Sequence, residues 1–487
     1  MNGISSLRLA RWEWRRLVAE RTGLVLLAFW CGLLALATAY GVRDVRARQA
    51  DIAAALERDR VAWETKTALL AEIEAGRVDP KPFEDPRSPT NSVMGRSGER
   101  PLVSWPVPLA ALASGTGDLA PPVRRVGMIN KLHLPPESLE NPANRLAGPL
   151  DLAFVTAALL PLFVLALSFD VLARERDAGI LPLLGTQPVA LARLVFARLA
   201  VHFAALGLPL ALAATTAVVL TLASGASVVA AMGELVLWLA LAAAYLVFWQ
   251  ALAASLNFRA RSAAHNATLL CGAWLAAVIL LPSFVQSFVQ VVAPPPDRRE
   301  FVLRVREVET DLFKRVEEIR DAYYAADPAR RPGAALNEYD TYFVQNLWPR
   351  ALAADAALAP ALASVEQARA AQAGWWRRLA WLSPTLAFRL GTEQLAGVTP
   401  VQQAEFVVQA RVYQQRWRTH FGAKLSSMTP LTLADYDTKP DPVPLRLSFA
   451  ARLRSALGAL AGVLGAAALL VAMLRWTPNR TTAFSKP

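Results

Sequence analysis

Six apolar runs, each about long enough to cross a lipid bilayer as a helix, constrain this chain more than any other feature. They occupy residues 24–42, 150–169, 194–222, 231–254, 267–292 and 456–474. A transmembrane helix needs about 20 apolar residues to cross a hydrocarbon core of about 30 Å. Because backbone polar groups in lipid must be satisfied within the segment, such runs predict helices. The sequence therefore predicts an all-α polytopic membrane protein with six transmembrane helices.

The composition agrees with a membrane location. Hydrophobic residues make up 54% of the 487 and charged residues only 18%, whereas soluble domains carry about a quarter charged residues. The net charge of +12 is not gathered in a dense basic run with interleaved aromatics, so we expect no nucleic-acid partner. Cys31 and Cys271 both fall inside apolar runs, which predicts small buried hydrophobes and argues against a redox pair or a thiolate zinc site.

Basic residues in the termini and short loops predict how the spans are oriented. They cluster before span one, between spans two and three, between spans four and five and after span six, and are absent from residues 223–230. Because positive charge concentrates on the cytoplasmic side, both termini are expected there. The chain then divides into an N-terminal helix, span one, an extracytoplasmic insertion, spans two to five, a second such insertion, span six and a cytoplasmic tail. These segments are residues 1–22, 23–42, 43–149, 150–292, 293–455, 456–474 and 475–487.

Few ionisable side chains lie within the spans, and most of them are close to span ends. Asp151, Arg198 and Glu234 are interpreted as interfacial residues, because a charge costs less near the headgroups than at the bilayer centre. His202 follows Arg198 by one helical turn and lies deeper, where it makes either a helix–helix hydrogen bond or a substrate contact. Proton-coupled carriers place ionisable groups near mid-membrane, so this distribution favours an external motor.

Residues 6–20 predict an amphipathic N-terminal helix. Its apolar side chains are Leu7, Leu9, Trp12, Trp14 and Leu17. Arginines and two glutamates occupy the rest of its surface. Tryptophan beside arginine is typical of a helix lying in the headgroup plane. Two interpretations stay open: an elbow helix beside a soluble partner, or a basic anchor that only sets topology.

The connection between spans two and three, residues 170–193, has a distinctive pattern. Charged residues at 174–177 end the membrane helix, Gly179 breaks it, and an apolar turn at 180–184 precedes Pro188. The result is an amphipathic knob between two membrane helices. An apolar knob rimmed by charge fits a groove on a soluble partner.

This connection resembles the coupling region of ABC-2 type permeases, the membrane subunits of ABC exporters. In that family a charged pair, a glycine, an apolar turn and a proline follow the second span and contact the ATPase. The matching residues are Glu175, Arg176, Gly179, Ile180, Leu181, Leu183, Leu184, Gln187 and Pro188. Pro182 departs from the family, in which many members have a charged residue at this position. The resemblance implies that this connection is an ATPase-coupling loop.

A second resemblance lies in the second insertion. Residues 381–397 read WLSPTLAFRLGTEQLAG, with aromatic residues following at 406, 413, 417 and 421. This part is similar to a bacterial subgroup of the same permeases, the GldF-like gliding-motility permeases, which carry large insertions after spans one and five. Together the resemblances imply a permease that pairs with an identical or homologous second permease. They also imply a cytosolic ABC ATPase that binds ATP and Mg²⁺, and they specify no cargo.

Both insertions are expected to be helical wherever a period is visible. Apolar residues recur every three or four positions within 52–73, 301–323 and 406–421. Such stripes bury against one another, which predicts a helical module above the membrane. Residues 79–149 are rich in proline, glycine and serine and predict an irregular loop with short elements. Pro282 predicts a break near the outer end of span five, where the resemblance implies a partly re-entrant helix.

The chain lacks the sequence signatures of the common nucleotide-binding and embedded enzymes. It has no GxxxxGK(S/T), HExxH or GxSxG motif, and its four histidines are scattered. We therefore expect no enzyme activity, no metal site and no cofactor in this chain. The expected partners are the ATPase, a second permease, membrane lipid and an extracytoplasmic partner. The alternative is a non-transporting scaffold or sensor whose outer module binds a ligand or partner.

Overall fold

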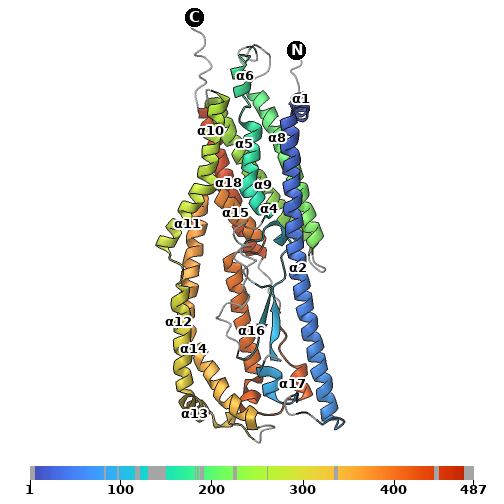
Figure 1. The fold of residues 1–487 in the computed structure, drawn as a ribbon, viewed down its shortest axis with the longest axis vertical. Helices are drawn as coiled ribbons and strands as arrows, with labels where there is room; N and C mark the ends of the chain where they lie inside the picture. Colours follow the sequence, from blue (N-terminus) through green and yellow to red (C-terminus); the bar gives the residue numbers. More distant parts are fainter. Residues whose placement is uncertain are drawn as a thin grey trace.

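The protein is an elongated and mostly helical molecule (Figure 1). The computed structural model describes residues 6–79, 81, 84–95, 98–115, 121–129, 150–180, 183, 186, 191–222, 227–259, 262–333, 338–443 and 449–476. A bundle of apolar helices forms one half, at the end where both termini lie. A second, largely helical module projects from the other end of the bundle (Figure 1).

Six helices of the described chain are long and apolar enough to cross a membrane, which confirms the predicted number. They are Arg21–Glu74, Leu152–Asp177, Arg193–Thr221, Val228–Phe258, Ala263–Val292 and Phe449–Met473. Their elements are α2 (Arg21–Glu74), α4 (Leu152–Phe154), the π-helical η5 (Val155–Leu159), α5 (Leu160–Ser168), α6 (Ala173–Asp177), α8 (Leu191–Thr221), α9 (Val228–Arg259), α10 (Ala263–Trp274), the π-helical η6 (Leu275–Leu280), α11 (Leu281–Val292) and α18 (Phe449–Trp476). The amphipathic helix α1 (Ser6–Ala19) precedes α2, as predicted.

Large aromatic side chains fill the centre of the bundle. Trp30, Trp238, Tyr245 and Trp249 are all fully buried, and the Trp30 indole donates to the Leu206 carbonyl at 3.0 Å. The prediction that both cysteines are buried is wrong, because Cys31 and Cys271 are exposed on the outside of their helices. In a membrane helix the outer face is as apolar as the inner one, so hydrophobicity does not tell which side is buried.

The projecting module combines both insertions. The second insertion forms α12 (Arg298–Lys314), α13 (Val316–Ala326), η7 (Pro328–Arg330), α14 (Glu338–Leu379), η8 (Ala380–Leu382), α15 (Pro384–Leu395), α16 (Pro400–Ser427) and α17 (Leu433–Asp437), of which η8 and α15 pack against the bundle. The first insertion adds η1 (Thr90–Met94), η3 (Ala110–Leu112) and two strands, β1 (Arg100–Val103) and β2 (Val123–Val126). The strands pair antiparallel, with Arg100 opposite Val126. Short elements within an irregular segment agree with the prediction for this region.

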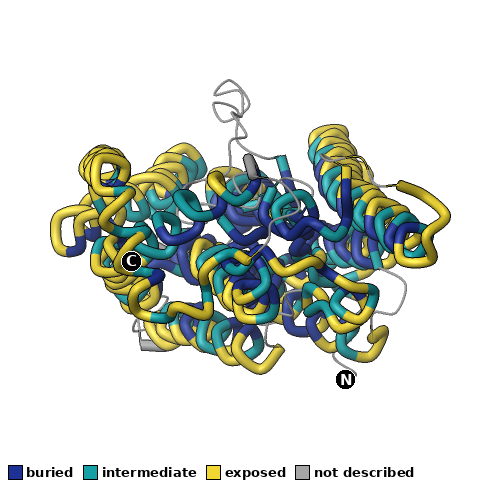
Figure 2. Tube along the Cα trace, turned by 90° about the horizontal axis from the view of Figure 1, so that it is seen from below, coloured by how far each residue is buried: buried dark blue, intermediate teal, exposed yellow. Residues whose placement is uncertain are grey.

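The predicted apolar stripes form the core of the module. The stripe of α16 is buried throughout, and Trp417 packs against Trp63 of α2 with ring centroids 6.1 Å apart. In α12, Val305 and Leu312 pack against Leu358 of α14. Because α2 is one continuous helix, it carries span one directly into this core. Viewed along the long axis, buried residues gather at the centre and exposed residues at the periphery (Figure 2).

The structure differs from the prediction at span five. The helix does not break at Pro282: it continues from η6 into α11, with Pro282 in the first turn of α11. The wider π-helical turns directly before Pro282 accommodate a proline within this continuous helix, where its missing N–H removes one backbone hydrogen bond. The short helix α15 enters the bundle instead, and Phe388 stacks on Tyr245 of α9 at 4.8 Å. Gly391 allows this approach, since a Cβ there would lie 2.7 Å from the Cβ of Ala459.

Candidate functional site

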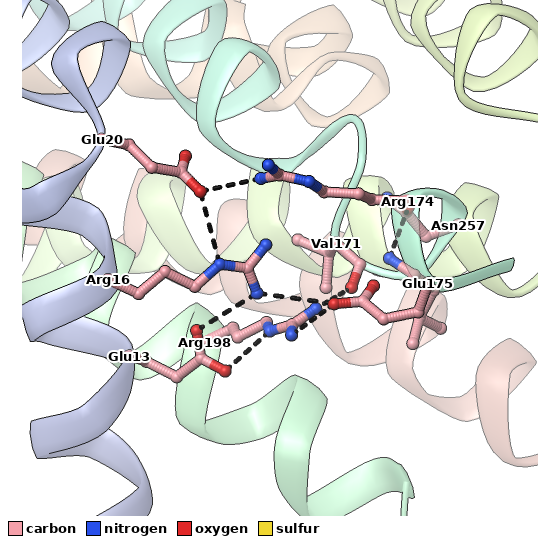
Figure 3. A network of polar contacts seen from close by, with 9 residues as sticks. Glu13, Arg16, Glu20, Val171, Arg174, Glu175, Arg198 and Asn257 are labelled. Atoms are coloured by element: carbon pink, nitrogen blue, oxygen red, sulfur yellow. Dashed lines mark hydrogen bonds and ion pairs between the residues drawn. The ribbon is translucent and has the colours of Figure 1, made fainter. Parts of the chain in front are cut away.

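Glu175 lies at the base of the connection between spans two and three, and it is buried. Its carboxylate accepts hydrogen bonds from Arg198 of α8 at 2.6 Å and from Arg16 of α1 at 3.4 Å (Figure 3). The sequence places Glu175 in a charged run that ends a membrane helix, and such a run is usually exposed to water. Here it joins α6 to α8 and to α1, which is distant in sequence.

Arg198 is the centre of this cluster. Its Nε donates to Glu13 of α1 at 2.8 Å, and its Nη1 donates to the Val171 carbonyl (Figure 3). Glu13, Glu175 and Arg198 are all buried. With Arg16 the cluster holds two arginines and two glutamates, so its charges compensate one another. Buried charges are tolerated only when they are paired and hydrogen-bonded in this way. The interfacial interpretation of Arg198 therefore misses its main role, which is to bind two carboxylates.

A more exposed pair forms the rim of the same cluster. Glu20 accepts from Arg174 at 2.7 Å and from Arg16 at 3.4 Å (Figure 3). Burial favours a higher pKa for Glu20, but the hydrogen bond and charge of Arg174, together with Arg16, outweigh it and lower the pKa below the ordinary value of 4.5. We use the name base cluster for Glu13, Arg16, Glu20, Arg174, Glu175 and Arg198. This cluster ties α1, α6 and α8 together.

Polar side chains in the neighbouring spans hold the backbone where span two unwinds. His202 is buried, and its Nδ1 lies 3.2 Å from the Ser168 hydroxyl. His202 therefore makes a hydrogen bond between two helices, as in the first of the two interpretations of this residue. Asn257 of α9 donates to the Ser168 carbonyl at 2.7 Å, and its Oδ1 accepts from Leu172 N. Asn266 donates to the Phe169 carbonyl. Sequence reasoning missed both asparagines and Glu13, although an asparagine beside a predicted span was a visible signal.

The tip of the connection is apolar and exposed. Gly179, whose backbone is left-handed, ends α6. Its N–H donates to the Arg176 carbonyl and the Ile180 N–H donates to the Glu175 carbonyl, both at 3.0 Å. This pair of bonds is a Schellman motif, which favours glycine at the left-handed position. Beyond it, Ile180 is 46% exposed and Leu183 is 68% exposed. The other predicted coupling residues, namely Leu181, Leu184, Gln187 and Pro188, lie outside the described residues.

A second buried ion pair lies toward the opposite end of the bundle. Arg452 of α18 binds both carboxylate oxygens of Glu234 of α9, at 2.7 and 3.2 Å. Its Nη1 also donates to the carbonyl of Leu395 at the end of α15, at 3.2 Å. We use the name outer clamp for these three residues. The sequence singled out Glu234 but not Arg452, which lies just before the predicted span six. Asp151 caps α4 and accepts from Phe154 N and Ser114 N.

The described residues contain no group of three or more His, Cys, Asp or Glu that could hold a metal ion. A family model described as a domain of unknown function (DUF3526) matches residues 298–441. That match covers α12 to α17, less than a third of the chain, and includes none of the six candidate spans. No curated protein matches the chain. No solved structure matches it either.

Proposed function

We propose that this chain is the transmembrane permease subunit of an ABC exporter in the inner membrane. In this role it couples ATP hydrolysis by a separate ATPase subunit to export of a substrate. The observation that carries the proposal is the connection between spans two and three, which joins an exposed apolar tip at Leu183 to a buried ionic base at Glu175. The resemblance of this connection to the coupling region of ABC-2 type permeases supports it.

The base cluster supplies a path for force. Movement of the tip passes through α6 to Glu175, and from there to Arg198 on α8 and Arg16 on α1. Because charge-assisted hydrogen bonds with buried partners are strong and directional, these elements move together. For coupling, the closed state of the ATPase must favour one membrane state by a few kcal/mol. In this proposal ATP and Mg²⁺ are bound by the ATPase, and this chain has no enzyme activity of its own.

The proposal includes a second permease, identical or homologous, and places both insertions on the extracytoplasmic side. The basic residues near the termini and the short loops support that orientation. The projecting module then lies in the periplasm, where it gates release or hands cargo to a partner. Helix α6, which leads to the tip, lies at the end of the bundle that also holds α1, where a cytosolic ATPase would dock (Figure 1).

Replacing the exposed apolar tip tests the proposed coupling. We expect Leu183→Asp to lower the ATPase activity of the purified, reconstituted complex at least fivefold, because the charge prevents packing into a partner groove. The matched control is Leu303→Asp, an exposed leucine of α12. Fold is checked by the thermal denaturation midpoint of each variant. If no subunit with a nucleotide-binding motif accompanies the unmodified chain, or if Leu183→Asp retains full activity, the coupling assignment is wrong.

Labelling with a membrane-impermeant maleimide tests the orientation. Thr186, near the tip, and Thr65, in the projecting part of α2, are both exposed. With Cys31 and Cys271 replaced by alanine, Thr65→Cys should react in spheroplasts, and Thr186→Cys only after the membrane is permeabilised. The reverse pattern would place the tip away from any cytosolic ATPase and would end the exporter proposal.

A second candidate function is a non-transporting sensor. A pocket of about 680 Å³ between α2 and the β-hairpin favours it, lined by charged and aromatic side chains that include Asp59, Trp63, Lys66 and Arg125. Ligands bind preferentially in concave sites with a few polar groups. A sensor predicts that no ATPase accompanies the purified chain, and the Leu183→Asp experiment separates the two functions for that reason.

A further inference from the structure

The C-terminal end of α14 lies beside span five. The Gln372 side chain donates to the carbonyl of Ala293, which directly follows α11, at 3.0 Å. Three residues later, Trp375 packs edge-on against Phe288 of α11 with ring centroids 6.1 Å apart. Trp376 packs against the same small core, around Val289. From Gln372 onward, therefore, α14 runs alongside the outer part of a candidate membrane span.

The turn that follows α14 lies near the middle of the bundle. Ser383 donates to the carbonyl of Ala277 in span five at 3.4 Å. The Thr385 hydroxyl lies 3.0 Å from the Tyr245 hydroxyl in span four. Both partners are close to the midpoints of their spans. The turn and the start of α15 are thus at mid-depth, and α15 returns from there to the outer clamp at Leu395.

Two adjacent arginines, Arg377 and Arg378, precede this turn, and both are exposed. They lie five or six residues before Ser383, which at a rise of about 1.5 Å per residue places them about 8 Å outward of the turn. The half-thickness of a hydrocarbon core is about 15 Å. Within the described chain neither guanidinium has a carboxylate partner, and Arg378 lies over the Trp375 ring at 5.5 Å. Two cations therefore lie on the surface of the bundle at the depth of lipid chains.

The surface around the arginines is apolar. Trp381 is 60% exposed, Leu382 is 61% exposed, and Phe284 of α11 is 67% exposed. Charged side chains at membrane depth bind an opposite charge or reach toward the headgroups. An occupant of this surface must carry both a negative charge and a long apolar part.

We propose that the turn between α14 and α15 binds an anionic phospholipid from the leaflet on the side of the projecting module. The phosphate lies between the guanidinium groups of Arg377 and Arg378, and the acyl chains lie along Phe284, Trp381 and Leu382. This inference rests on the six candidate spans and does not depend on the exporter function. Because α15 begins at the same turn, a bound lipid would also stabilise the entry of α15 into the bundle.

Native mass spectrometry tests the site with the full chain in nanodiscs of equal parts phosphatidylglycerol and phosphatidylcholine. We expect the unmodified protein to retain phosphatidylglycerol over phosphatidylcholine, and Arg377→Gln with Arg378→Gln to lower that ratio at least fivefold. The matched control, Arg306→Gln with Arg416→Gln, removes the same charge from exposed positions of α12 and α16. It should leave the ratio unchanged. Replacing Arg377 and Arg378 by lysine should keep most of the preference.

A photoreactive phosphatidylglycerol provides a readout on the unmodified protein that needs no variant to fold. Crosslinks should concentrate on residues 375–389 and on α11 around Phe284. The proposal is overturned if the unmodified protein shows no headgroup preference, if the glutamine variant keeps it, or if crosslinks fall elsewhere. It is also overturned if the glutamine variant separates a dimer while the lipid count is unchanged, because a second copy would then cover these arginines.

Discussion

Two buried arginines, at opposite ends of the same bundle, are paired in different ways. In the base cluster, Arg198 binds two carboxylates from two different elements, and a second arginine, Arg16, shares both of them, at 3.4 Å from Glu175 and 3.9 Å from Glu13. In the outer clamp, Arg452 binds one carboxylate with its two terminal nitrogens, and its Nη1 also donates to a backbone carbonyl at the end of α15. Both clusters are neutral overall, yet one connects side chains of several elements and the other also binds the backbone at the end of a helix.

The difference shows what each cluster can transmit. Displacing α6 or α1 breaks charge-assisted bonds in the base cluster, so its parts are energetically coupled. The outer clamp couples α9 to α18 directly, and to α15 only through one carbonyl at a helix C-terminus, where a cation is favoured by the helix dipole. The base cluster is therefore suited to relay a push on the connection, and the outer clamp to hold α15 within the bundle.

The largest expected effect follows from removing Arg198. Arg198→Met leaves Glu13 and Glu175 buried without their main partner, and breaking such a pair costs about 5 kcal/mol, the upper end for buried ion pairs. The thermal denaturation midpoint of the purified protein should fall sharply. Combining the change with Glu13→Gln and Glu175→Gln should recover most of the loss, because no uncompensated charge remains. An unchanged midpoint for Arg198→Met would show that the base cluster does not hold these elements together.

A smaller effect is expected at the outer clamp. Arg452→Met leaves only Glu234 unpaired, which should cost about 3 kcal/mol, the lower end of the same range. Hydrogen exchange should rise in residues 384–397, because the Leu395 carbonyl loses its donor, while residues 170–180 stay as protected as before. Arg198→Met should give the opposite pattern. Equal exchange in both regions for both variants would mean that the two clusters are not independent.

The smallest effect belongs to the exposed rim of the base cluster. The pKa of Glu20 in the folded state is lower than its ordinary value of 4.5. Its pairing with Arg174 therefore stabilises the folded state at pH values above 4.5, and this stabilisation is lost as the pH falls through the folded-state pKa. Glu20→Gln should therefore cost about 0.5 kcal/mol at neutral pH, as exposed pairs do. The difference from the unmodified protein should shrink below pH 4.5 in denaturation curves. A difference that grows toward acid pH would contradict this assignment.

Local patterns predicted most of the helical framework. The six spans were visible because helix-length apolar runs have few other solutions, and the stripes of α12 and α16 because a helical period depends only on neighbouring turns. The same reasoning was wrong about Pro282 and about the cysteines. The helix continues through Pro282 because a π-helical segment directly before it accommodates the proline. The two sides of a membrane helix are equally apolar, so nothing in the sequence indicated that Cys31 and Cys271 are exposed.

The candidate site was predictable only in part. Glu175, Arg198, His202 and Glu234 stood out as polar residues in or beside apolar runs, where polar groups are costly. Their partners did not stand out. Glu13 looked like one of several charges on an amphipathic helix, although it is buried against Arg198 in the structure. Nothing local in α1 distinguishes the buried glutamate from the exposed charges.

The amino-acid order alone determined that this chain has six candidate membrane spans and a helical projecting module, because the length and period of apolar segments are properties of neighbouring residues. Only the tertiary structure decided which charges are neutralised and how deep α15 lies in the bundle. The partners Glu13 and Arg198 are 185 residues apart, and Glu234 and Arg452 are 218 apart. A buried charge is stabilised by whichever element packs beside it. Which helices become neighbours cannot be read from the sequence of either helix alone.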